Sequence, residues 1–75
     1  MTKREAQRAA WQWANAHTPG ARVLKRRRTE NGSGRMFDVL SGPTEKCFLL
    51  VRLIVFDTGD LVVAKDRRSK FVRAD

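Results

Sequence analysis

The sequence predicts an α+β domain in which an N-terminal helix packs on a four- to five-stranded antiparallel meander sheet. Three observations carry this prediction: one long apolar run, an alanine-rich segment that starts with a helix cap, and turn sequences that separate short extended segments. At 75 residues the chain forms a single small basic domain spanning residues 1–75.

The apolar run, residues 46–57 (KCFLLVRLIVFD), has the composition of a central strand covered on both faces. The odd positions from 47 to 55 form an unbroken apolar file. The even positions from 48 to 56 are apolar except for one arginine, and we name them as a candidate interface: Phe48, Leu50, Arg52, Ile54 and Phe56. One short helix can cover only one face, which we expect to be the odd one. The even face would be closed by curling of the sheet into a small barrel, by a homodimer, or by a partner.

The helix is expected over residues 3–17. Thr2 and Glu5 have the spacing of a capping box, and alanines fill the segment. Trp13 shares a face with these alanines and is the expected core anchor, whereas Trp11 lies on the polar side with Arg4 and Arg8. An exposed indole between arginines suits stacking on a base, and the alternative is that Trp11 packs beneath a loop.

Three or four further strands are expected around the central run. They are residues 22–28 and 35–40, joined by a turn at 29–34 that contains Asn-Gly, then 61–65, and a short strand or docked segment at 71–72. Residues 41–45 are expected to reverse the chain into the central run.

The charge balance favours a polyanionic partner. Sixteen Lys and Arg against eight Asp and Glu give a net charge of +8 and a pI near 11.1. Most of this charge lies in two basic clusters. The first contains Arg22, Lys25, Arg26, Arg27 and Arg28, and the second contains Lys65, Arg67, Arg68, Lys70 and Arg73. In a meander these clusters occupy the two sheet edges, and closure into a barrel would bring them together. The alternative is that they are solvated edges that prevent aggregation.

We therefore expect a non-enzymatic protein that binds the phosphates of DNA or RNA. The candidate contact residues are Arg4, Arg8, Trp11, Arg22, Lys25, Arg26, Arg27, Arg28, Lys65, Arg67, Arg68 and Lys70. The sequence matches no helix-turn-helix, zinc-finger or RNA-stacking motif. The alternative is a small protein of the kind carried by phages or mobile elements, which binds an acidic or nucleic-acid-binding host protein and inhibits or redirects it.

Catalysis is not expected, and neither is a cofactor or a metal. His17 is the single histidine, and its place at a helix end is explained by the helix dipole. Cys47 is the single cysteine and begins the apolar file, which is typical of an inert thiol. The chain has no apolar run long enough to span a membrane. We expect a cytoplasmic protein that has no membrane partner and that could form a homodimer.

Overall fold

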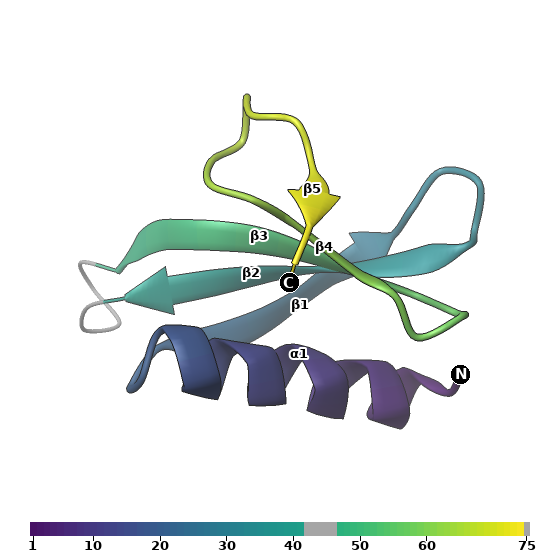
Figure 1. The fold of residues 1–75 in the computed structure, drawn as a ribbon, viewed down its shortest axis with the longest axis horizontal. Helices are drawn as coiled ribbons and strands as arrows, with labels where there is room; N and C mark the ends of the chain where they lie inside the picture. Colours follow the sequence, from purple (N-terminus) through teal and green to yellow (C-terminus); the bar gives the residue numbers. More distant parts are fainter. Residues whose placement is uncertain (42–46, 75) are drawn as a thin grey trace.

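One helix and five strands make up the part of the chain that the structure, a computed structural model, describes: residues 1–41 and 47–74. They are α1 (Lys3–His17), β1 (Arg22–Arg28), β2 (Gly34–Ser41), β3 (Phe48–Phe56), β4 (Leu61–Ala64) and β5 (Val72–Arg73). The strands pair in the order β1-β2-β3-β4-β5, each antiparallel to its neighbour. Figure 1 shows α1 along one side of the twisted sheet. The predicted α+β meander is confirmed, and residues 42–45 of the expected reversal at 41–45 lie outside the described residues.

The sheet does not close into the small barrel considered from the sequence. β1 and β5 lie at opposite ends of the strand order, so both are edges. Closure would require these two strands to pair along their length, and β5 has only two residues. The two basic clusters are consequently held at opposite edges of the sheet rather than brought together.

The capping box predicted for the helix forms as expected. The Thr2 hydroxyl accepts a hydrogen bond from the Glu5 N–H at 3.2 Å, and the Glu5 carboxylate accepts one from the Thr2 N–H at 2.9 Å. The helix ends at His17, where the Thr18 N–H and hydroxyl both donate to the Ala14 carbonyl. Gly20 then reverses the chain into β1 with a φ of 83°, a conformation that favours glycine.

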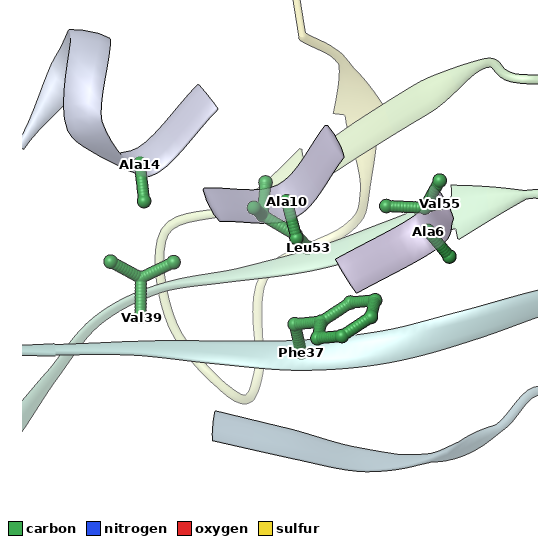
Figure 2. Packing of buried hydrophobic residues seen from close by; sticks show 7 residues of the cluster. All are labelled: Ala6, Ala10, Ala14, Phe37, Val39, Leu53 and Val55. Atoms are coloured by element: carbon green, nitrogen blue, oxygen red, sulfur yellow. The ribbon is translucent and has the colours of Figure 1, made fainter. Parts of the chain in front are cut away.

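A layer of small side chains lets α1 lie close on the sheet. Its buried residues are three alanines, which face apolar residues of β2 and β3 (Figure 2). The cluster consists of Ala6, Ala10, Ala14, Phe37, Val39, Leu53 and Val55. The odd face of the central strand is therefore the face beneath the helix, as predicted. Trp13 packs at the margin of this cluster rather than at its centre.

The close approach of the helix makes Ala10 intolerant of a larger side chain. We expect Ala10→Leu to destabilise the fold by about 1–3 kcal/mol, because the added carbons must displace packed neighbours. The matched control is Ala16→Leu, at an exposed position of the same helix. It should change stability by less than about 0.5 kcal/mol. Urea unfolding of both variants measures the difference, and equal effects would contradict this packing.

Glu5 should make the helix sensitive to acid. Hydrogen bonds from the backbone and side chain of Thr2 lower the pKa of Glu5 from its ordinary value of 4.5. A lowered folded-state pKa stabilises the fold above the unfolded-state pKa and loses that contribution as the pH falls through the folded-state value. The stability advantage of the wild type over Glu5→Gln should therefore shrink below pH 4.5. Thermal unfolding across pH tests this, and Thr2→Ala, which keeps the backbone N–H but removes the hydroxyl, should lessen the dependence without abolishing it.

Candidate nucleic-acid interface

The first basic cluster forms an exposed edge of the sheet. All of its residues lie in β1, and five consecutive residues, Leu24 to Arg28, are exposed. The register with β2 shifts between Lys25 and Arg28, so three steps along β1 match two along β2. At this bulge Arg26 and Arg27 both border one hollow on the sheet surface. The bulge therefore gathers consecutive cations that a regular strand would send to alternate faces.

A buried carboxylate organises the arginines beside this edge. Asp38 of β2 lies on the sheet face opposite the helix and is only 2 % exposed. Its Oδ1 accepts from the Arg52 Nε–H at 2.9 Å, and its Oδ2 lies 3.1 Å from the Arg26 Nε. Asp38 and Arg52 are direct cross-strand partners in the β2–β3 register. One carboxylate thus links side chains from three neighbouring strands.

The hollow at this site is lined by cations. Its lining residues are Lys25, Arg26, Arg27 and Arg52, and its volume is about 400 Å³. The guanidinium groups of Arg26, Arg27 and Arg52 and the Asp38 carboxylate give a local charge of 3 − 1 = +2. Lys25 borders the hollow, but its side chain lies on the helix side with that of its register partner Phe37. Both ion pairs engage the guanidinium Nε, so each guanidinium keeps Nη–H donors on its other edges that can reach a second acceptor. An anion such as a phosphate oxygen suits these donors.

The positive surface continues onto the flank of α1 next to β1. The adjacent Lys3 amine, followed by partial desolvation and the charge of Arg35, lowers the pKa of Lys25. The helix flank that carries Lys3 therefore lies beside β1. Trp11 is 56 % exposed, as the first of the two sequence interpretations expected. It lies about 200° around the helix from Trp13, on the side that carries Arg4.

Arg28 is engaged elsewhere. Its guanidinium donates to the Gly32 carbonyl in the β1–β2 turn and pairs with Asp57 at 3.3 Å. Arg35 pairs with the same carboxylate at 3.5 Å. The Asn31 side chain orders this turn by accepting from Thr29 and Ser33. Arg28 thus joins the turn to the end of β3, which gives this arginine a structural role.

The second basic cluster lies at the other edge of the sheet. Lys65, Arg67, Arg68 and Lys70 are exposed in the segment between β4 and β5, and Arg73 is exposed in β5. The Asp66 carboxylate folds this segment by accepting from the N–H groups of Arg68 and Ser69 at 2.8 and 2.7 Å. Hydrogen bonds from Ser69 and Arg68 lower the pKa of Asp66. Because the sheet is open, this cluster is not part of the hollow.

The even positions of the central strand are less exposed than the sequence suggested. Ile54 is buried and Phe56 half-buried, and both lie against Gly34, where a Cβ atom would come within 2.8 Å of Ile54 Cγ2. Leu50 lies within a register shift and packs against the core cluster. Phe48, 60 % exposed, is the member of the candidate interface that stays open to solvent. Part of the expected apolar patch is therefore covered within the chain.

Asp38 is the site residue that the sequence analysis did not identify. A signal was present, because Asp38 is the single acidic residue within the apolar part of β2 and Arg52 is the single charge within β3. Two isolated charges in neighbouring strands can pair across the sheet if their registers coincide. The β2–β3 register contains a bulge at Leu50 of β3, which the sequence pattern did not predict.

No protein-family model matches the chain, and comparisons with curated proteins and with solved structures find no match. Within residues 1–41 and 47–74, no group of three or more His, Cys, Asp or Glu side chains could hold a metal ion. The one helix of this part of the chain lacks the length and apolar character needed to cross a membrane. The functional assignment therefore rests on the geometry of the site.

Asp38 and Asp57 each contact two arginines, but neutralising Asp38 should reduce stability much more than neutralising Asp57. Asp38→Asn leaves Arg26 and Arg52 facing one another without a counter-charge at a buried position. We expect a loss of about 2–4 kcal/mol in unfolding free energy. The matched control is Asp57→Asn, because Asp57 is 42 % exposed and also pairs with two arginines. It should cost less than about 1 kcal/mol. Chemical denaturation measures both, and a smaller loss for Asp38→Asn would contradict the organising role of Asp38.

Proposed function

We propose that the protein binds nucleic acid, with the β1 edge contacting the phosphate backbone. The observation that carries this proposal is the cationic hollow beside Asp38, with its local charge of 3 − 1 = +2 and Lys25 on the adjoining helix side of β1. Phosphate groups are the ligand that a cluster of planar guanidinium donors suits best. The residues assigned to the contact are Lys25, Arg26, Arg27 and Arg52, together with Arg22 at the start of β1.

The rigidity of the arginines supports phosphate binding over simple solvation. A freely rotating surface arginine loses about 2 kcal/mol of side-chain entropy when a ligand fixes it. Arg52 and Arg26 are already oriented by Asp38 through their Nε atoms. A phosphate that contacts their terminal nitrogens therefore meets partly preorganised donors. The exposed indole of Trp11, on the helix side that carries Arg4, offers a surface on which a base could stack.

The second basic cluster is not assigned to the same contact. It lies four strand positions from β1 in the sheet order, roughly 19 Å at the usual spacing of about 4.8 Å between strands. A single phosphate track along β1 does not reach it. Its cations contribute to the overall field that attracts a polyanion, and we assign them no direct contact.

Nucleic-acid binding should be salt-dependent and should depend on the β1 edge. We expect measurable binding of a labelled duplex of about 20 base pairs, or of a single strand of equal length, at about 50 mM salt. Lys25→Gln with Arg27→Gln should lower affinity about tenfold and reduce the slope of log K against log salt by about 1–2. Fluorescence anisotropy across a salt series measures both quantities.

The matched control removes the same charge from the other edge. Lys65→Gln with Arg67→Gln replaces one lysine and one arginine, as the first pair does, and should lower affinity less than about threefold. An equal effect of both pairs would assign binding to net charge rather than to the β1 edge. The absence of binding to duplex DNA, single-stranded DNA and RNA at low salt would end the proposal.

The alternative of a host-protein inhibitor of phage or mobile-element type stays a prediction, and so does a homodimer. Both are separable from nucleic-acid binding by nuclease treatment during purification. A partner retained after nuclease digestion is a protein, whereas a partner that is lost was bridged by nucleic acid.

A further inference from the structure

A second surface, an apolar groove, lies between α1 and the last two strands. Its floor and walls are formed by Trp13, Val51, Val63 and Val72, and its rim includes Lys65 and Lys70. The groove has a volume of about 450 Å³ and is much more apolar than the hollow at β1. It opens on the helix-covered side of the sheet, whereas the Asp38 carboxylate lies on the opposite side.

The groove exists because one helix is too narrow to cover five strands. α1 packs on β1, β2 and β3, so the apolar residues of β4 and β5 extend beyond it. Val72 is 61 % exposed, although it is paired with Val63 of β4. Trp13 forms the helix side of the groove and is held by stacking on His17, with ring centroids 4.2 Å apart. Trp13 therefore forms a positioned apolar wall opposite Val63 and Val72, which the helix does not cover.

The rim of the groove is positive. Lys65 and Lys70 are exposed, and neither forms an ion pair within the described residues. The acidic residue of the same segment, Asp66, uses its carboxylate to accept from the backbone of Arg68 and Ser69. The groove therefore combines an apolar floor with cationic groups at its border, which is the complement of an acidic segment with apolar anchors.

We propose that this groove binds a short extended acidic segment of a partner protein. Apolar side chains of the segment enter the groove between Trp13 and Val72, and its carboxylates meet Lys65 and Lys70. β5 ends the strand order, so no strand of the described residues pairs with its outer edge, and its two residues, Val72 and Arg73, can pair with the middle of the segment. Strand addition places alternate side chains on one face, which matches a segment that alternates apolar and acidic residues. A second copy of this chain is disfavoured, because each copy carries a charge of +8.

Tryptophan fluorescence can report occupancy of the groove. Trp11→Phe leaves Trp13 as the single indole of the chain. The probe is a peptide of about ten residues that alternates glutamate with leucine. We expect a saturable change in Trp13 emission at micromolar to submillimolar concentration. A peptide with lysine in place of glutamate, and another with serine in place of leucine, should each produce no saturable change at about 1 mM.

Variants of the groove locate the binding. Val72→Asp should weaken peptide binding at least about tenfold, since it places a carboxylate on the apolar wall. Leu24→Asp is the matched control, because Leu24 is an exposed apolar residue at the opposite edge. Lys65→Glu with Lys70→Glu should weaken binding about tenfold. Arg4→Glu with Arg8→Glu, the same charge change on the outer side of the helix, should weaken it less than about threefold. Circular dichroism confirms that each variant is folded.

Several outcomes would overturn the proposal. These are no saturable change with the acidic peptide, equal binding of the lysine peptide, and equal weakening by the control variants. Groove-dependent binding of phosphatidylserine vesicles without binding of the peptide would assign the surface to a membrane instead. Peptide binding and nucleic-acid binding can be tested separately. Val72→Asp should leave nucleic-acid binding within about twofold of the wild type. Lys25→Gln with Arg27→Gln should leave peptide binding unchanged.

Discussion

The ion-paired carboxylate of Asp38 is the constraint on which the open face of the sheet depends. It is the buried charged residue within the described part of the chain, and two arginines from neighbouring strands approach it. Moving a charged carboxylate out of water is energetically costly, so a buried one must be ion-paired and hydrogen-bonded. Pairing with Arg52 favours one register of β2 against β3, and pairing with Arg26 links β1 to both. The same contacts that satisfy the buried charge orient the guanidinium groups at the surface.

The two faces of the sheet differ in composition: one forms the apolar core and the other carries polar side chains. Beneath the helix, three alanines and four larger apolar residues make a dry layer, and this layer supplies the hydrophobic stabilisation of a small domain. The other face combines Ile54, packed on Gly34, with the polar network around Asp38. Polar side chains are tolerated there because water reaches one side of an open antiparallel sheet. An open sheet therefore gives the chain both a core and a charged surface.

The strand order also places two kinds of surface at opposite edges of the sheet. β1, at one edge, carries a cationic hollow that suits phosphate, and β4–β5, at the other, carry an apolar groove with lysines at its rim. Their positions follow from the strand order, which keeps the first and last strands apart. A barrel would have merged the two edges into one positive surface. With the sheet open, the proposed nucleic-acid contact and the proposed peptide contact lie at different edges.

Much of this fold could be predicted from local pattern, because local physical chemistry decides it. The capping box of Thr2 and Glu5, the alanine face of the helix and the apolar odd positions of β3 all depend on residues near one another in the chain. The candidate site was only partly predictable. The cations of β1 were identified, but their partner Asp38 was not, since that pairing depends on cross-strand registers that contain bulges in β1 and β3. The sequence by itself determined the elements, their order and the charge they carry. Only the tertiary structure decided that the sheet stays open and that Asp38 lies between Arg26 and Arg52, because both depend on contacts between residues distant along the chain.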